Sequence, residues 1–219
     1  KVYKLINARI RLVLDFVESR KTLEADLKSK QKYEYINMEN PKTFDDKLWY
    51  MKRHFFSPLA VKCADKVLAR EYVKDCGFGE ILVPVHGIYE SIDDVDFGLV
   101  PDECYIKCNG TSGCNYLYKK NQTDEKWIKK LFQLYQRRNY YKVSKEWVYK
   151  DARHQIIIEE KLEEEEGESL KDYRMFCFHG SLKVVMVNIG TATKQGEHAK
   201  EVLRSFYTPE FEWIQELRI

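Results

Sequence analysis

The segment at 104–118 has the residue types that hold a phosphate chain. It contains an extended stretch that ends in Lys107, a loop of small polar residues and glycine at 109–113, and a second extended stretch. Small residues let backbone N–H groups turn toward an anion, hydroxyl groups add donors, and a lysine from the adjoining strand supplies positive charge. The segment therefore favours phosphate binding, although a β-hairpin with an Asn-Gly turn has a similar sequence.

A second segment, at 155–162, has the features of a strand that binds a nucleotide base. Three isoleucines at 156–158 run directly into Glu159 and Glu160. An extended backbone offers alternating N–H and C=O groups to the edge of an adenine, and a carboxylate accepts hydrogen bonds from the adenine amino group. The alternative is a strand that leaves the core and enters a solvated acidic loop, which is the interpretation we favour for the glutamates at 163–166.

A third candidate is the pair of charged residues Asp172 and Arg174. Residues two apart on a strand point to the same face of the sheet, so these two side chains are expected to lie together. A carboxylate there could bind ribose hydroxyl groups, and a guanidinium group could bind phosphate. An ordinary salt bridge between the two side chains is the alternative.

Helices and strands must bring these residues together, and their order predicts an α+β fold with antiparallel or mixed sheets and flanking helices. Helices alternate with strand pairs and hairpins, which favours layered sheets and helices over a βαβ series. Helical spacing and capping residues predict helices within 1–36, after Thr43, after Asp65 and over 123–140. The expected strands lie at 81–89, 104–108, 115–118, 155–162, 172–178 and 182–189.

Several of the predicted helices have an apolar face, among them the helices after Thr43 and over 123–140. The helix after Thr43 is predicted to bury Phe44, Leu48, Trp49 and Met51. The helix over 123–140 is predicted to bury a larger face, made of Trp127, Ile128, Leu131, Phe132 and Tyr135.

Composition excludes several classes of protein. The chain has 219 residues, of which 44% are hydrophobic, and only 10 Gly and 5 Pro, so we expect a packed globular protein. Lys and Arg number 37 and Asp and Glu 35, and a net charge of +2 gives no general attraction to nucleic acid. The apolar runs are too short for a transmembrane segment, and without a secretory signal we expect a cytoplasmic location.

The order of these segments resembles the ATP-grasp superfamily, in which a strand with a lysine, a glycine-rich loop, a strand, a helix and a strand ending in Glu-x-x-Leu follow one another. Several strings are similar to its TupA-like branch, which is associated with bacterial surface-polysaccharide and teichuronopeptide assembly. They are Pro41-Lys-Thr-Phe-Asp-Asp-Lys, Cys63-Ala-Asp-Lys-Val-Leu-Ala-Arg-Glu-Tyr-Val, Lys107-Cys-Asn-Gly-Thr-Ser-Gly-Cys-Asn, Glu146-Trp-Val-Tyr-Lys, Ile158-Glu-Glu-Lys-Leu and Asp172-Tyr-Arg-Met-Phe-Cys-Phe-His-Gly.

The resemblance implies a role for four residues at the phosphates of ATP. Lys66 and Lys107 correspond to the two lysines that ATP-grasp enzymes direct at the nucleotide phosphates. Ser112 and Gly113 correspond to the flexible loop that closes over them.

The resemblance also implies contacts to the rest of the nucleotide. Glu159 begins the hinge that contacts adenine, in which Glu160 and Leu162 act largely through backbone atoms. Asp172 is similar to the ribose-binding acid of the related ribosomal-protein glutamate ligases, and Arg174 to a neighbouring phosphate contact with a catalytic role.

ATP-grasp enzymes hold Mg²⁺ between carboxylates, and usually an Asn, on late strands of the C-terminal half. The sequence has no hydrophobic strand of that pattern before Ile219. We therefore expect the metal-binding strands to lie outside it and name no metal ligand. The alternative is a protein that binds nucleotide without catalysis.

Together these features predict a helical N-terminal region at 1–62 and an ATP-grasp-like nucleotide-binding domain at 63–219. The resemblance implies an ATP-dependent carboxylate-amine ligase that forms an acyl phosphate and uses ATP and Mg²⁺. Its other substrates would be a carboxylate-bearing sugar or polysaccharide precursor, such as a uronic acid, and an amine. The alternatives are a glycosyltransferase of polysaccharide assembly and a degenerate ATP-binding scaffold module.

Overall fold

A computed structural model describes residues 2–18, 36–162, 171–190 and 202–217. Contacts divide the chain into two compact units, Lys1–Glu160 and Lys161–Ile219. The predicted domain boundary between residues 62 and 63 falls inside the first unit. Among the helices in the described ranges, none has the length and apolar character needed to cross a bilayer.

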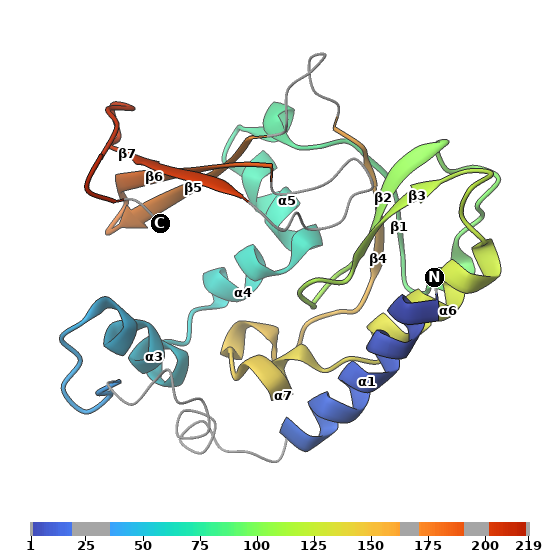
Figure 1. The fold of residues 1–219 in the computed structure, drawn as a ribbon, viewed down its shortest axis with the longest axis horizontal. Coiled ribbons are helices and arrows are strands. Elements are labelled where there is room, and N and C mark those ends of the chain that lie inside the picture. The colour runs from blue at the N-terminus through green and yellow to red at the C-terminus, as the bar shows by residue number, and fades with distance from the viewer. Residues whose placement is uncertain (1, 19–35, 163–170, 191–201, 218–219) are drawn as a thin grey trace. The chain divides into compact units, whose positions relative to one another are not determined.

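The first unit is built on a four-stranded antiparallel sheet in the order β1-β4-β2-β3 (Figure 1). Its strands are β1 (Val85–Tyr89), β2 (Glu103–Cys108), β3 (Asn115–Lys119) and β4 (Ile156–Glu160). β4 comes last along the chain but lies between β1 and β2. The sheet therefore brings residues about fifty positions apart onto neighbouring strands, as in the pair Ile106 and Ile158.

Helices and short 3₁₀ turns complete the first unit. They are α1 (Val2–Glu18), α3 (Phe44–His54), α4 (Pro58–Ala64), α5 (Lys66–Asp75), α6 (Glu125–Gln136), α7 (Tyr140–Ser144), η2 (Gly79–Ile81), η3 (Ile92–Asp94) and η4 (Trp147–Tyr149). The strand expected at 81–89 is shorter than predicted, because β1 begins only after Pro84, whose nitrogen cannot donate to a strand ladder.

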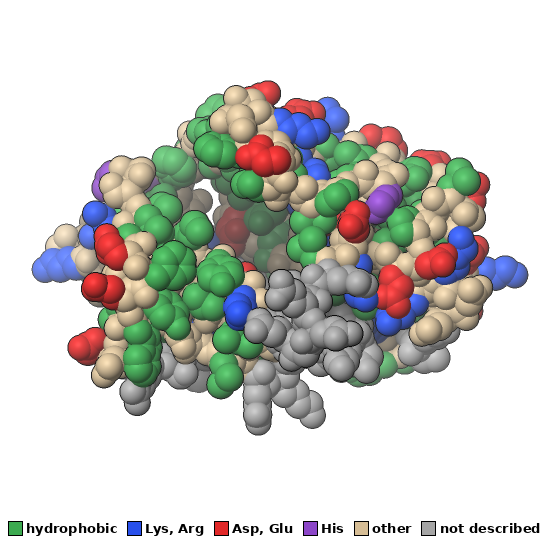
Figure 2. All heavy atoms as spheres, turned by 90° about the horizontal axis from the view of Figure 1, so that it is seen from above, with side chains coloured by type: hydrophobic (Ala, Val, Ile, Leu, Met, Phe, Trp, Pro, Cys, Tyr) green, Lys and Arg blue, Asp and Glu red, His purple; other side chains and the backbone are tan. Residues whose placement is uncertain are grey.

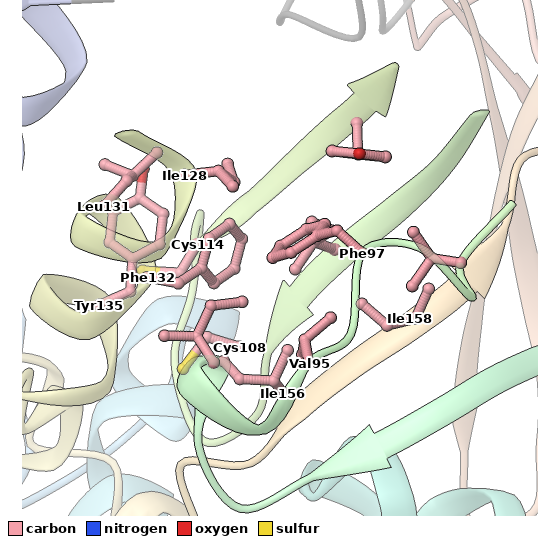
Figure 3. Packing of buried hydrophobic residues seen from close by; sticks show 14 of the residues in the cluster. Val95, Phe97, Cys108, Cys114, Ile128, Leu131, Phe132, Tyr135, Ile156 and Ile158 are labelled. Carbon is pink, nitrogen blue, oxygen red and sulfur yellow. The ribbon is translucent and has the colours of Figure 1, made fainter. Parts of the chain in front are cut away.

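α6 covers one face of this sheet and forms the core with it. Asp124 caps the helix by accepting a hydrogen bond from the Trp127 amide at 3.1 Å. The predicted apolar face of α6 is confirmed, because all five of its residues are buried. Figure 3 shows Ile128, Leu131 and Phe132 of this helix in the cluster that also contains Ile156 and Ile158 of β4.

The buried face of α3 is not the one that the sequence predicts. Of the four residues predicted to be buried, only Trp49 is buried, whereas Phe44, Leu48 and Met51 are 50%, 43% and 45% exposed. The inner side of the helix instead carries Asp46, whose carboxylate accepts hydrogen bonds from backbone amides of the preceding segment. These bonds fix the helix with Asp46 and Trp49 inward, and the predicted apolar stripe lies outward.

Asp46 makes the stability of this region sensitive to acid. Hydrogen bonds from the backbone of Asn37 and Thr43 lower the pKa of its carboxyl from 3.8 to about 2. Because the folded pKa is depressed, the stabilisation is present above pH 3.8 and is lost as the pH falls through about 2. Thermal unfolding should show that Asp46→Ala is less stable than wild type at neutral pH and that the difference closes near pH 2.

The matched control for this prediction is Asp45→Ala, because Asp45 is an exposed carboxylate in the first turn of the same helix. We expect Asp45→Ala to lose stability between neutral pH and about pH 2 as wild type does. A gap between wild type and Asp46→Ala that persists unchanged to pH 2 would contradict the assignment.

The second unit contains a three-stranded antiparallel sheet in the order β5-β6-β7. Its strands are β5 (Lys171–Phe178), β6 (Ser181–Ile189) and β7 (Leu203–Tyr207). The predicted hairpin between β5 and β6 is present, with His179 and Gly180 at φ values of 50° and 77°. β7 is a strand that the sequence pattern does not predict, and it pairs with β6 from residue Leu203 to Tyr207. Helices together with these antiparallel sheets confirm the predicted α+β class.

Candidate functional site

The sheet register of the first unit places Lys107 and Glu159 together. Tyr105 lies opposite Glu159, and two pairs further along the strands Lys107 lies opposite Ile157. Lys107 and Glu159 are therefore diagonal neighbours on one face of the sheet, within reach of each other's side chains. The Lys107 ammonium group forms an ion pair with Oε2 of Glu159, and the two side chains are 30% and 10% exposed.

A third charged residue, Arg70 of α5, reaches the same carboxylate. Its Nη1 atom lies 3.8 Å from Oε1 of Glu159, and its Nη2 atom donates a hydrogen bond to the carbonyl of Val83. Arg70 follows Lys66 by four residues, so the two side chains share one face of the helix. Arg70 was not predicted as a site residue, although its spacing from Lys66 was a signal for it.

Lys66 begins α5 directly after the capping residue Asp65, whose carboxylate accepts hydrogen bonds from the amides of Val67 and Leu68. The Lys66 amide donates to Oδ1 of Asn109 at 2.9 Å, and its ammonium group donates to the carbonyl of Thr111 at 3.1 Å. Lys66 therefore contacts the 109–113 loop through both its backbone and its side chain.

Burial lowers the pKa of Lys66 below the 10.5 of an ordinary lysine, and the positive charge of Lys107 acts in the same direction. As the pH rises, the Lys66 ammonium group therefore loses its proton at a lower pH than an ordinary lysine does. We expect ATP affinity to fall between neutral pH and 10.5, and Lys66→Arg to remove much of this fall because arginine stays charged. Calorimetric titrations across this range check the prediction, and identical pH profiles for the two proteins would contradict it.

The 109–113 loop is closely packed at its base and open at its tip. Gly110 has a φ of 64°, and a Cβ there would lie 2.7 Å from Ala152 Cβ and 2.8 Å from the Arg153 carbonyl, so only glycine fits. Ser112 and Gly113 at the tip are exposed, and a Cβ on Gly113 would meet no atom closer than 3.8 Å. The loop joins β2 and β3 as a hairpin, which is the form considered as the alternative to a phosphate-binding loop. Lys66 and Lys107 lie at the base of this hairpin.

Asn109, at the base of this loop, was also not predicted as a site residue. Its side chain is fully buried, and Oδ1 accepts hydrogen bonds from the amides of Lys66 and Gly110, both at 2.9 Å. Its Nδ2 atom has no hydrogen-bond partner within the described residues. Asn109 thus holds the start of the loop against the first turn of α5.

The other two residues of the predicted adenine hinge, Glu160 and Leu162, have different surroundings from those of Glu159. The amide of Glu160 donates to the carbonyl of Pro84 at 3.0 Å, and its exposed carboxylate lies 3.8 Å from His86 Nε2. Leu162 is 49% exposed and belongs to the second unit.

In the second unit, Asp172 and Arg174 do share a face of the sheet. Nε of Arg174 lies 3.1 Å from Oδ2 of Asp172, which is the salt bridge considered as the alternative. The same carboxylate oxygen accepts a hydrogen bond from Nδ2 of the buried Asn188 side chain at 3.2 Å. Oδ1 of Asn188 in turn accepts a hydrogen bond from Nε of Arg204 at 3.0 Å. A polar row thus crosses all three strands at the positions that the register pairs.

The predicted site residues therefore form two groups. Lys66, Lys107 and Glu159 lie together in the first unit beside the loop of Ser112 and Gly113, and Asp172 and Arg174 lie together in the second. No cluster of three His, Cys, Asp or Glu side chains suited to a metal ion occurs in the described parts of either unit.

The face of the molecule in Figure 2 shows charges of both signs. On the face shown in Figure 2, Lys and Arg side chains lie among Asp and Glu side chains, with hydrophobic side chains between them. This agrees with the net charge of +2.

Neither the curated proteins nor the solved structures gave a match. The sequence model of the TupA-like ATPgrasp family matches residues 46–217, which is more than half of the chain and includes every predicted site residue. This match confirms the resemblance and the ATP-grasp-like fold class, and it implies ATP-dependent, ligase-type chemistry in general. The chain therefore belongs to the TupA-like ATP-grasp family.

Proposed function

We propose that this protein is an ATP-dependent ligase that joins a carboxylate to an amine through an acyl phosphate. Family membership supports the ATP-dependent, ligase-type part of this proposal. The observation that carries it is the convergence of Lys66 and Lys107, from a helix and a strand, at the base of one glycine-containing loop. Two ammonium groups beside exposed loop residues suit a polyphosphate chain.

The proposed reaction has two steps. A carboxylate oxygen attacks the γ-phosphorus of ATP, the bond from that phosphorus to the bridging oxygen breaks, and ADP leaves. The amine then attacks the acyl carbon, the carbon–oxygen bond to phosphate breaks, and inorganic phosphate and a proton are released. The first step depends mainly on positioning and charge neutralisation, which Lys66, Lys107 and Arg174 are proposed to supply.

The other predicted residues complete the proposed nucleotide contacts. Ser112 and Gly113 would close over the phosphates, Glu159, Glu160 and Leu162 would contact adenine, and Asp172 would bind the ribose. ATP-grasp proteins generally bind ATP with Mg²⁺, which neutralises phosphate charge. We assign no residue of this chain to the metal.

The two buried cysteines of β2 are poorly suited to act as nucleophiles. Cys108 follows Lys107 directly, but burial raises the pKa of its thiol to about 12. Burial likewise raises the pKa of Cys104 to about 11. Neither thiol provides a thiolate nucleophile near neutral pH.

The substrates are proposed by chemical class. The carboxylate would come from a uronic acid or a similar unit of a bacterial surface polysaccharide or its precursor, and the amine from an amino compound, with both joined in the cytoplasm.

The test supplies the complete protein with ATP, Mg²⁺, a uronic acid acceptor and an amine. We expect release of ADP and inorganic phosphate only when the carboxylate is present, and hydroxylamine should trap the intermediate as a hydroxamate. Release of UDP from a sugar donor without ATP consumption would contradict the proposal and indicate glycosyl transfer. ATP binding without turnover of any carboxylate in a broad panel would indicate a scaffold module.

A further inference from the structure

Both oxygens of the Glu159 carboxylate face a cation. Oε2 pairs with the Lys107 ammonium group, and Oε1 lies 3.8 Å from Nη1 of Arg70. The Glu159 side chain is only 10% exposed, whereas those of Arg70 and Lys107 are 18% and 30% exposed. This carboxylate is therefore largely shielded from water and depends on these two partners.

The ion pair with Glu159 conflicts with the proposed role of Lys107. A phosphate that binds the Lys107 ammonium group competes with Glu159 for it, so the ion pair with Glu159 weakens when a nucleotide binds. A shielded carboxylate that loses its partner stays charged without compensation, and this is strongly unfavourable. Nucleotide binding at Lys107 thus requires a second cation that keeps Glu159 neutralised.

Arg70 has the geometry for this task. Its Nη2 atom is bound to the carbonyl of Val83, which anchors the guanidinium group at the entrance to β1 while Nη1 faces Glu159. A planar guanidinium group can serve both partners at once, whereas a lysine ammonium group is a single point charge on a flexible stem.

We propose that Arg70 is a positioning residue that holds Glu159 when Lys107 moves to the phosphates of the nucleotide. Arg70 thereby promotes phosphate binding without contacting the nucleotide. This inference rests on the proposed function, because it needs Lys107 as a phosphate contact.

A thermodynamic cycle tests the inference with ATP and adenosine as ligands. Calorimetry would compare wild type, Arg70→Met, Glu159→Gln and the double variant of the complete protein. We expect Arg70→Met to weaken ATP binding roughly tenfold and to leave adenosine binding unchanged, because adenosine does not require Lys107. In the Glu159→Gln background, where Lys107 is already released, Arg70→Met should have no further effect on ATP.

Two further variants control for charge and folding. Lys74→Met removes a positive charge from an exposed position of the same helix and should leave ATP affinity unchanged. Arg70→Lys keeps the charge but not the planar fork, and we expect its ATP affinity to lie between those of wild type and Arg70→Met. If Arg70→Met does not fold, the same cycle is measured with Arg70→Lys.

An equal loss of ATP affinity in both backgrounds, or a matching loss for adenosine, would overturn the inference. The proposed function has a separate outcome. Unchanged ATP affinity in Lys107→Ala would show that Lys107 does not contact the phosphates and would contradict the proposed function. A loss of ATP affinity in Lys107→Ala with no loss in Arg70→Met would overturn only the role of Arg70.

Discussion

Replacement of Lys107 by alanine should weaken ATP binding about ten- to a hundredfold, which corresponds to about 1.5 to 3 kcal/mol for one charge-assisted contact. The fold should survive, because Lys107 is on the sheet face opposite the core residues Ile106 and Cys108. Arg70 also remains beside Glu159, so the carboxylate keeps one cation. Calorimetric titration with ATP measures the binding loss, and circular dichroism checks the fold.

Lys119→Ala is the matched control for this prediction. Lys119 lies in the same sheet, is also 30% exposed, and pairs with Glu103 at 3.1 Å, but it ends β3 away from the 109–113 loop. We expect its ATP affinity to equal that of wild type. Loss of affinity in both variants would indicate a general effect of charge, and loss in neither would leave the 109–113 segment as an ordinary hairpin.

The second large effect is expected at Phe132, in the core of the first unit. Its side chain is fully buried in α6, and its ring meets that of Tyr135 edge to face at a centroid distance of 5.2 Å. Truncation to alanine removes buried apolar contacts and leaves a cavity, so Phe132→Ala should lower the free energy of unfolding by about 3 to 5 kcal/mol. Urea unfolding followed by circular dichroism measures the change.

Lys130→Ala tests whether the effect comes from the core and not from α6 in general. Lys130 is exposed on the same helix, and substitution there should change the free energy of unfolding by less than about 0.5 kcal/mol. A similar effect of both substitutions, or less than about 1 kcal/mol for Phe132→Ala, would contradict the core assignment.

The features that follow from local patterns were predictable from sequence. The buried face of α6 follows from helical spacing and an Asp124 cap, and both are properties of neighbouring residues. The shared face of Asp172 and Arg174 follows from the two-residue period of a strand. The strands that carry Lys107 and Glu159 were likewise recognisable from their composition.

Features that depend on distant residues were not predictable. The pairing of Lys107 with Glu159 requires β4 to lie beside β2, and the side chains of these residues are 52 positions apart in sequence. The outward stripe of α3 depends on backbone amides from Asn37 to Thr43, which bind Asp46 and orient the helix. β7 becomes a strand through its pairing with β6.

The most direct test of the nucleotide site is a calorimetric comparison of ATP and GTP, each with Mg²⁺, on the complete protein. The proposed contacts of the 159–162 segment to the adenine edge predict that ATP binds more tightly than GTP, because guanine presents a carbonyl oxygen where adenine presents its amino group. Equal affinity for the two nucleotides, or no binding of either, would contradict the account.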